Sequence, residues 1–505
     1  MYGVEHSECS YKSSALRGAA YVIAAQLVRV VLLFSSIIVL SRLLSPEDFG
    51  LVACLTPVIA FIGLFQDMGM QQAIIQRKTI TDKQLNEIFW VVFATGMACA
   101  IVLCLMSPLV AWFYNDPRLL PLSIVASCSL LLTSIASIPL SILNRAMQFK
   151  KLAFIDVTAN IVGFVTPIVG AIYCMKYWAL ILQPISIALV TAVGALCINA
   201  WKPGRLCFSI DRDIVGFGAN LTGFNFVNFF ARNLDNVLIG RTQGPLELGF
   251  YDRAYKLLLF PLSAINAPLS KVMIPILSRI QTDKDRAQRV YMCVSGVLAF
   301  VVTPGMAALM AVPHDVVLLL FGVKWQAVGP IFFWLGLAGL VQPLYATSGW
   351  LFISQNRTKE YFRWGVFAST TTILSFFLGL HWGALGIATA FAVTECFIRA
   401  PCLYWYVGKI GLAKTSDYAK IQLPLIAAAG LTWIVVRYFF QEELALHGAA
   451  IIIASLLLSY TVAVCSFLFN TLGISVLSEL GSLPLFFLRM REGTSFKADD
   501  EKVSS

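Results

Sequence analysis

A series of long, uninterrupted apolar runs constrains this chain more than any other feature of its sequence. A helix needs about 20 residues to cross a hydrocarbon core of about 30 Å, and runs of this length recur between residues 18 and 469. The runs are continuously apolar and lack the alternation of barrel strands, so they favour helices over a β-barrel. We therefore predict an all-α, polytopic integral membrane protein with about fourteen transmembrane helices. The expected spans are 18–41, 49–66, 88–114, 118–143, 153–175, 178–200, 214–240, 250–278, 288–312, 328–353, 362–380, 383–407, 419–438 and 447–469.

The composition argues against a soluble enzyme. Residues are 58% hydrophobic and 13% charged, with a mean hydropathy of +0.79, whereas a soluble domain carries roughly 25% charged residues. The twelve cysteines lie mostly inside apolar runs and form no CxxC pair, so no metal site and no cofactor are expected. The sequence has neither a phosphate-binding loop nor an HExxH motif, and its four histidines stand apart. We therefore predict no catalytic residues.

Lysine and arginine gather at one set of helix ends. When they are assigned to the expected loops, 25 of the 37 lie on one side and 6 on the other. Cytoplasmic loops carry the excess of positive charge in membrane proteins, so both termini are predicted to be cytoplasmic, which requires an even number of spans. The net charge of +10 thus indicates orientation in a membrane and not a nucleic-acid partner.

Two copies of one motif indicate an internal repeat. Arg42-Leu-Leu-Ser-Pro-Glu-Asp-Phe-Gly50 follows the first expected span, and Arg241-Thr-Gln-Gly-Pro-Leu-Glu-Leu-Gly249 follows the seventh, at an offset of 199 residues. The repeat predicts two pseudo-symmetric six-helix lobes related by an axis along the membrane normal. Within it, equivalent tight turns are expected at Pro46 and Gly50 and at Pro245 and Gly249. The expected division is a cytoplasmic tail at 1–17, an N-lobe at 18–200, a C-lobe at 213–407, two further helices at 419–469 and a disordered cytoplasmic tail at 489–505.

Several cations lie inside the expected spans and cannot be assigned to loops. Arg29 lies 12 residues past Arg17, about 18 Å along a helix axis, and a cation at the bilayer centre costs about 2.5–3.5 kcal/mol. Its own helix offers no acid within reach, so Arg29 is expected to face a wet cavity, a partner on another helix or an anionic ligand. The six cations are Arg29, Arg232, Arg253, Lys256, Lys271 and Arg399.

Acids lie one helical turn from three of these cations. Spacings of three or four residues place the members of each pair on one helix face. The pairs are interpreted either as local ion pairs that hold helices together or as sites of ion coupling. They are Arg232 with Asp235, Asp252 with Lys256, and Glu395 with Arg399.

A polar stripe accompanies Arg29. Gln26 and Arg29 are three residues apart, and at the repeat offset of 199 their counterparts are Asn225 and Asn228. Corresponding polar faces suit a shared central cavity, but the same stripes also hydrogen-bond neighbouring helices to one another.

Four stretches carry a family resemblance. They are Ser41-Arg-Leu-Leu-Ser-Pro-Glu-Asp-Phe-Gly50, Asp67-Met-Gly-Met-Gln-Gln-Ala-Ile-Ile-Gln-Arg77, Asn233-Leu-Asp-Asn-Val-Leu-Ile-Gly-Arg241 and Leu248-Gly-Phe-Tyr-Asp-Arg-Ala-Tyr255. The sequence around them resembles the polysaccharide exporters of the MOP flippase superfamily, of the colanic-acid and xanthan type.

The resemblance implies a flippase that moves an undecaprenyl-diphosphate-linked oligosaccharide repeat unit across the bacterial cytoplasmic (inner) membrane, for exopolysaccharide or O-antigen biosynthesis. It also implies two lobes in a V shape like those of MATE transporters, alternating access, and coupling to H⁺ or Na⁺. Membrane lipid and the polymerase and co-polymerase of the same pathway are the implied partners. A diphosphate would be neutralised by cations in a cavity, for which the candidates are Gln26, Arg29, Asn225, Asn228, Arg232, Lys256, Lys271 and Arg399. Candidates for ion coupling are Asp235, Asp252 and Glu395.

Two other classes of function remain open. A MATE-type multidrug or cation antiporter would have an acidic or aromatic cavity, whereas the charges inside these spans are mostly basic. A membrane-bound polysaccharide polymerase or ligase would need a substantial outer loop for its catalytic residues, and the longest outer loop here, between about 312 and 328, is short.

The charge asymmetry makes the topology testable. Reporter fusions after residue 284 should be cytoplasmic, and fusions after residue 320 should be periplasmic, because Lys and Arg are concentrated in loops of the first kind. The opposite result at either position would contradict the assigned orientation.

Overall fold

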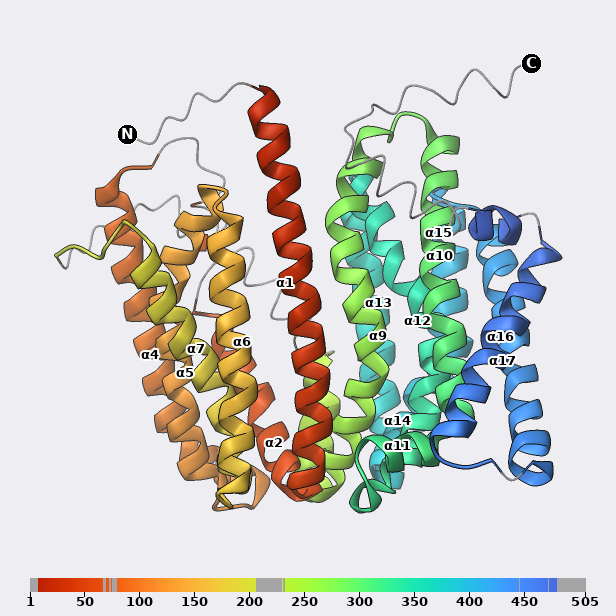
Figure 1. The fold of residues 1–505 in the computed structure, drawn as a ribbon, viewed down its shortest axis with the longest axis horizontal. Helices are drawn as coiled ribbons and strands as arrows, with labels where there is room; N and C mark the ends of the chain where they lie inside the picture. Colours follow the sequence, from red (N-terminus) through yellow and green to blue (C-terminus); the bar gives the residue numbers. More distant parts are fainter. Residues whose placement is uncertain are drawn as a thin grey trace. The chain divides into compact units, whose positions relative to one another are not determined.

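The structure, a computed structural model, describes residues 8–66, 70–71, 74, 80–205, 229, 232–444, 446–470 and 472–478. Within these ranges every regular element is a helix and no strand occurs. Figure 1 shows the helices in sequence order. They are α1 (Glu8–Leu43), α2 (Pro46–Gly63), α4 (Asp82–Tyr114), α5 (Leu119–Arg145), α6 (Phe149–Ile172), α7 (Tyr177–Ile198), α9 (Gly244–Arg279), α10 (Lys284–Ala311), α11 (Pro313–Leu320), α12 (Val328–Ser354), α13 (Thr358–Gly379), α14 (Gly383–Thr394), α15 (Ala400–Ile410), α16 (Thr415–Val435) and α17 (Ala449–Leu468).

The predicted helical membrane fold is confirmed, but the number of fourteen spans is not. In the described part of the chain, eleven helices are long and apolar enough to cross a membrane, or up to twelve if Gly244–Asn266 and Pro268–Arg279 form one bent span. Thr358–Ile410 qualifies as a single run of 53 residues, although a 3₁₀ turn at Leu380–Trp382 separates α13 from α14. Most of the expected span 214–240 lies outside the described residues.

The chain divides into two compact units. The first comprises 1–258, 313–335 and 365–394, and the second comprises 259–312, 336–364 and 395–505. These units do not follow the lobes expected from the sequence repeat, which stay a prediction. Helix α1 also begins at Glu8, inside the segment expected to be a tail.

In the first unit, α1, α4, α5, α6 and α7 form a bundle of neighbouring helices (Figure 1). Serines on α5 allow close packing: the hydroxyls of Ser127, Ser134 and Ser141 each donate to a carbonyl of their own helix. Small side chains of this kind let membrane helices approach one another without leaving a polar group unsatisfied.

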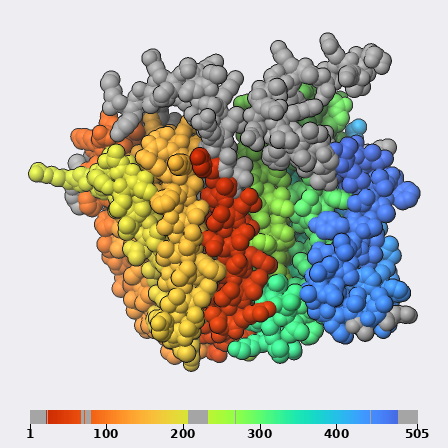
Figure 2. Space-filling model, viewed as in Figure 1, coloured from red at the N-terminus to blue at the C-terminus, as the bar shows by residue number. Residues whose placement is uncertain are grey.

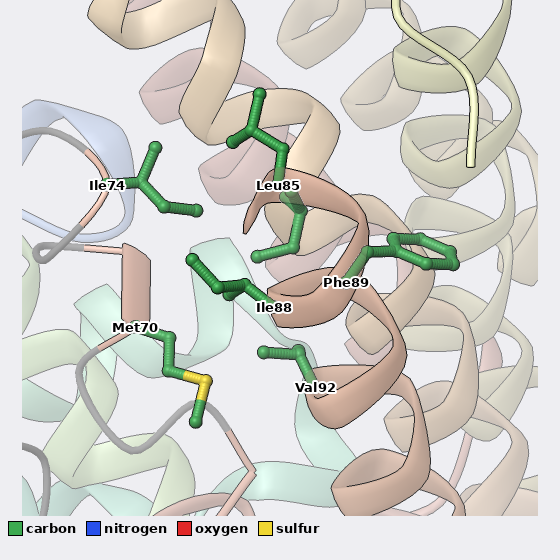
Figure 3. Packing of buried hydrophobic residues seen from close by; sticks show 7 residues of the cluster. Met70, Ile74, Leu85, Ile88, Phe89 and Val92 are labelled. Carbon is green, nitrogen blue, oxygen red and sulfur yellow. The ribbon is translucent and has the colours of Figure 1, made fainter. Parts of the chain in front are cut away.

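An apolar cluster holds the start of α4. Thr81 caps the helix and exchanges hydrogen bonds with Gln84 in a capping box, which satisfies donors that a helix end leaves free. From the first turns, Leu85, Ile88 and Val92 point toward Met70 and Ile74, as Figure 3 shows. Met70 and Ile74, which follow α2 in the sequence, are thereby packed onto α4.

The second unit contains a buried tyrosine cluster. The hydroxyls of Tyr291 and Tyr418 are 2.9 Å apart, Tyr291 also lies 3.3 Å from the Thr347 hydroxyl, and the Tyr404 ring stacks on Tyr418 at 4.5 Å. The cluster joins α10, α12, α15 and α16. In α17, the Ser459 hydroxyl donates to the carbonyl of Pro304 in α10. Both α16 and α17 are therefore packed onto α10.

Removal of the Tyr418 side chain should therefore loosen this unit. Tyr418 is fully buried, and Tyr418→Ala is expected to lower the free energy of unfolding by roughly 3 kcal/mol, as deletions of buried aromatic rings do. Tyr438, whose side chain is exposed, provides the control, and Tyr438→Ala should change stability by less than about 0.5 kcal/mol. Thermal unfolding in detergent measures both; equal losses would contradict the packing role.

Candidate functional site

Arg29 is exposed and lies on a stripe of α1 that holds both buried and exposed side chains. At about 100° per residue, Arg29 points within about 40° of Ala25 and Ser36, which are buried, and of Leu33, which is 49% exposed. It points away from Leu27 and Val31, which are 61% and 63% exposed. The Ser36 hydroxyl accepts a hydrogen bond from Gln183 of α7, so α1 contacts the bundle at Ser36, two turns from Arg29. Figure 2 shows that α1, in red, is otherwise uncovered along much of the face in view.

Arg29 has no ion pair with the residues that the structure describes, and its side chain is exposed. The acids on other helices that could neutralise it have other partners. Asp156 accepts from Asn160 on its own helix at 3.1 Å, Asp235 accepts from Tyr251, and Glu395 pairs with Arg399. Gln26, one turn earlier, is half-buried.

Asp235 does not pair with Arg232. Asp235 is buried and accepts a hydrogen bond from the Tyr251 hydroxyl at 2.9 Å, whereas the Arg232 side chain is exposed. A spacing of three residues places two side chains near one another on a helix. Here, however, the Asp235 carboxylate faces Tyr251 of α9 and not Arg232. The expected counterparts of the α1 stripe, Asn225 and Asn228, lie outside the described residues.

Three charged residues at the start of α9 form one network. The Asp252 carboxylate is 2.9 Å from Lys256 Nζ and 3.0 Å from Arg253 Nη2. The Arg253 guanidinium also lies over the Phe49 ring, 4.1 Å from its centroid, a favourable cation–π arrangement. The spacing of four residues predicts the Asp252–Lys256 pair, and the structure confirms it. No role was predicted for Arg253, although it directly follows the acid that it contacts.

Glu395 and Arg399 form a buried ion pair in the second unit. Both side chains are at most 5% exposed, and the five residues from Glu395 to Arg399 are wound as a π-helix. Such segments are rare and are found mostly at functional sites. In contrast, Lys271 on α9 is exposed and forms no ion pair with described residues. Arg399 therefore carries its own counter-charge, and Lys271 does not.

The two repeat motifs begin helices in the same way and lie against each other. Pro46 is the first residue of α2, and Pro245 is the second of α9. A Cβ atom placed on Gly50 would overlap the carbonyl oxygen of Pro245, and one placed on Gly249 would overlap that of Pro46. The motifs thus meet backbone to backbone.

An ion pair braces this junction from the loop between α4 and α5. Arg118 Nη2 lies 2.6 Å from Glu47 and 2.7 Å from Asp116. Burial raises the pKa of the Asp116 carboxyl, but its hydrogen bonds to Arg118 and the positive charge of Arg118 outweigh this and hold the pKa below its ordinary value. Asp116 is therefore charged at neutral pH.

This fold, with charges held inside apolar helices, is that of a multi-pass helical membrane protein. A family model described as "Polysaccharide biosynthesis protein" matches residues 39–330. The chain belongs to this family.

Relatives over most of the chain have names from the same field. The chain is 26% identical to the lipopolysaccharide biosynthesis protein WzxC of Escherichia coli, over 85% of this chain and 88% of WzxC. It is 26% identical to the teichuronic acid biosynthesis protein TuaB of Bacillus subtilis, over 74% and 78% of the two chains. It is 25% identical to the succinoglycan biosynthesis transport protein ExoT of Rhizobium meliloti, over 81% and 83%.

Solved structures show the fold. The lipid II flippase MurJ in an inward closed conformation superposes with a TM-score of 0.69 at 14% identity, covering 89% of this chain and 98% of MurJ. An inward-facing multidrug resistance MATE family transporter of the MOP superfamily superposes at 0.58 and 13% identity, covering 80% and 99%.

The buried pair on the π-helix makes a prediction about stability. Glu395→Met leaves Arg399 buried without its anion and should cost about 3–5 kcal/mol. Glu395→Met with Arg399→Met removes both charges and should restore most of the loss. Abundance in the membrane and thermal unfolding measure the effect.

The control is the part-exposed pair Arg357–Glu360, where Glu360→Met should change stability far less than Glu395→Met does. If the double variant Glu395→Met with Arg399→Met is no more stable than Glu395→Met alone, the two buried charges do not compensate one another.

Proposed function

We propose that this protein is a flippase that moves a polyprenyl-diphosphate-linked oligosaccharide repeat unit from the cytoplasmic to the outer leaflet of the bacterial inner membrane. Membership of the polysaccharide biosynthesis family supports the proposal. So do the transport protein ExoT among its relatives and the lipid II flippase MurJ among its structural neighbours. The observation that carries it is Arg29, an exposed cation within an apolar span of α1 that has no ion pair with the described residues.

A diphosphate supplies the charge that Arg29 lacks. A guanidinium has planar, paired N–H donors that match two phosphate oxygens at once. Water around the exposed Arg29 side chain would keep it hydrated in the empty transporter, and the diphosphate would replace that water when substrate enters. The cost of a cation within the membrane is then offset in both states.

The other cations proposed for the substrate site fall into two groups, those with an ion-pair partner and those without one in the described residues. Arg232 and Lys271 are exposed and have no ion pair with described residues, so they are available to substrate. Lys256 is paired with Asp252, and Arg399 with Glu395. We therefore propose Arg29 and Arg232 of the first unit as substrate contacts, leave Lys271 of the second unit as a separate candidate, and assign Arg399 to the protein itself.

For ion coupling we favour Asp235. It is buried, it accepts hydrogen bonds from the Tyr251 hydroxyl and the Asn236 backbone N–H, which are both neutral, and it has no cationic partner in the described residues, so a proton or Na⁺ would supply its counter-charge. Asp252 and Glu395 already have cationic partners, which makes them less suited to take up an ion.

The available charges also favour the flippase over a cation antiporter. The three exposed charges that are candidates for contact with substrate, Arg29, Arg232 and Lys271, are basic, and basic groups repel cationic drugs while they attract a diphosphate. A polymerase or ligase would need a set of catalytic groups at an outer loop, and the outer loop between α10 and α12 is taken up by the short helix α11 and a 3₁₀ turn at Val323–Trp325.

Substitution of Arg29 tests the proposal. Arg29→Ala should abolish polymer export with unchanged protein abundance, because it removes the phosphate contact and leaves no acid unpaired. Arg29→Lys should retain part of the activity, since an ammonium keeps the charge and loses the paired donors. Polymer secretion and immunoblotting of the membrane fraction measure the two effects side by side.

Arg437, an exposed arginine near the end of α16 whose guanidinium bonds Gln441, provides a matched control. Arg437→Ala should leave secretion unchanged. Normal secretion with Arg29→Ala would contradict the proposal. If Arg29→Ala instead lowers protein abundance, and a second substitution that neutralises a nearby Asp or Glu restores it, Arg29 belongs to an ion pair within the protein.

A further inference from the structure

Helix α2 ends beside the middles of two longer helices of the first unit. Its regular winding stops at Gly63, and a turn follows in which the Gln66 N–H donates to the carbonyl of Gly63 at 3.2 Å. The Gln66 carbonyl accepts a hydrogen bond from Thr95 at 2.9 Å, close to the middle of α4. The Gln66 side-chain amide donates at 2.8 Å to the carbonyl of Leu130, close to the middle of α5. The turn therefore lies deep between two membrane spans.

Irregular backbone at this depth is a constraint on what surrounds it. Non-helical segments occur inside a membrane only where they are buried in protein or line a water-filled space. Neighbouring side chains satisfy part of this segment: the Cys99 thiol donates to the carbonyl of Ile62 at 3.6 Å, and Gln66 also donates to the Thr133 hydroxyl at 2.8 Å. The turn is not fully buried, however, because Phe65 is 37% exposed and Gln66 is half-buried. By this rule it lines a space that holds water or a ligand.

The accessible side of the turn faces the second sequence repeat. A stripe of residues at helical spacing runs along α2, and its earlier members Cys54 and Pro57 are buried. Cys54 lies against Gly240 of the second repeat, where a Cβ atom would be 3.1 Å from its sulfur. Phe61 continues the stripe, is half-buried, and has its ring centroid 5.4 Å from that of Phe229. The space beside the turn thus lies between helices of the two repeats and not on the outside of the bundle.

Three aromatic rings and one amide border this space. The rings of Phe61 and Phe65 meet edge to face with centroids 5.7 Å apart, and Phe229 adds a ring from the second repeat. The amide nitrogen of Gln66 is fixed by its two bonds to α5. Its amide oxygen accepts no hydrogen bond in the described part of the chain. An aromatic surface therefore lies next to a held, available acceptor.

This combination suits a sugar ring. A pyranose has a face of C–H groups that packs on an aromatic ring, and a rim of hydroxyls that donate to an amide oxygen. A diphosphate would need cationic donors, and none of the four residues at the site is charged. A hydrocarbon tail would leave the amide oxygen of Gln66 without a partner. The chemistry therefore favours the glycan part of a lipid-linked substrate.

The site lies close to a cation that is proposed to contact substrate. Arg232 follows Phe229 by three residues and is exposed, so the Cα atoms of the two residues are at most about 11 Å apart. In a polyprenyl-diphosphate-linked glycan, the first sugar is bonded directly to the diphosphate. A first sugar beside Phe229 would therefore place its diphosphate within reach of Arg232.

We propose that Phe61, Phe65, Gln66 and Phe229 form a subsite for the sugar that is bonded directly to the diphosphate of the substrate. The subsite rests on the proposed flippase function. Phe65 packs on the C–H face of the sugar ring, and Gln66 accepts a hydrogen bond from one of its hydroxyls. Because the bond to Thr133 holds the amide in one orientation, Gln66 selects a sugar with a hydroxyl at the matching position.

Substitution of Phe65 tests the ring contact. Phe65→Leu keeps an apolar side chain and removes the ring, so it should lower polymer export about tenfold at equal protein abundance, the upper range for one aromatic contact. Phe65→Tyr keeps the ring and should retain at least about half of the export. Polymer secretion and immunoblotting of the membrane fraction measure the two effects.

Phe154, which is 64% exposed on α6, provides the matched control, and Phe154→Leu should leave export unchanged. Export by Phe65→Leu equal to that of the unaltered protein would overturn the subsite. A loss of protein in proportion to the loss of export would also overturn it, because the ring would then serve only packing within the protein.

Photo-cross-linking identifies the group that contacts position 65. Phe65 is replaced by p-benzoylphenylalanine in cells that make the polymer, and illumination should join it to the lipid-linked intermediate of the same cells. Mild acid then cleaves the bond between the first sugar and the diphosphate. Tandem mass spectrometry of the peptide should still show sugar fragment ions after this step, because the cross-link is to the sugar itself. The same replacement of Phe154 should give no sugar ions.

The other adducts contradict the subsite. If acid removes the sugar from the peptide, position 65 contacts the diphosphate or the polyprenyl chain. If the adduct is a phospholipid, position 65 faces the bilayer. If no adduct forms, the position contacts no ligand.

These results separate the subsite from the proposed function. If deletion of the protein leaves polymer export intact, the flippase proposal fails, whereas a sugar that stays on the position-65 peptide still shows a sugar-binding site. If deletion abolishes export and acid strips the sugar from the peptide, the flippase proposal stands and the subsite fails.

Discussion

The cost of an unsatisfied charge in hydrocarbon governs how this structure is arranged. Backbone groups are satisfied within the helices, but an arginine or a carboxylate in a span needs a partner or water. Glu395 and Arg399 meet the requirement by burying one another, and Asp252 meets it by taking two cations. Arg29 is different, because its side chain is exposed and has no ion pair with the described residues, so water or an anion has to satisfy it.

This difference separates charges that are paired within the protein from charges that can contact a ligand. A paired, buried charge such as Arg399 has little attraction left for an anion, whereas Arg29 keeps its full charge. Charges that must change partners during a transport cycle should be those without a permanent one. The same reasoning distinguishes Asp235, whose partner is a neutral hydroxyl, from the carboxylates that face cations. Polar groups without a function in transport are instead satisfied locally, as with the serines of α5.

The junction of the repeats depends on another constraint, the size of a side chain. Two helices approach so closely at Gly50 and Gly249 that the carbonyl of a proline occupies the space of a Cβ. Close approach through small residues is how membrane helices associate where the hydrophobic effect between them is absent. Because the chain repeats, one such contact appears twice, and Trp325 packs over both halves. Duplicated sequence thus produces a symmetric contact from a short motif.

The sequence by itself determined the helical membrane class, the places of most helices and the family, because apolar length and motif spacing are local properties. It also predicted the Asp252–Lys256 and Glu395–Arg399 pairs, since residues four apart on a helix are neighbours. Only the tertiary structure decided that Asp235 meets Tyr251 and not Arg232, and that Arg253 lies over Phe49. Only it revealed why the motif glycines and Trp325 matter. Those contacts join residues far apart in the chain, and their partners depend on how helices pack, which no spacing along one helix encodes.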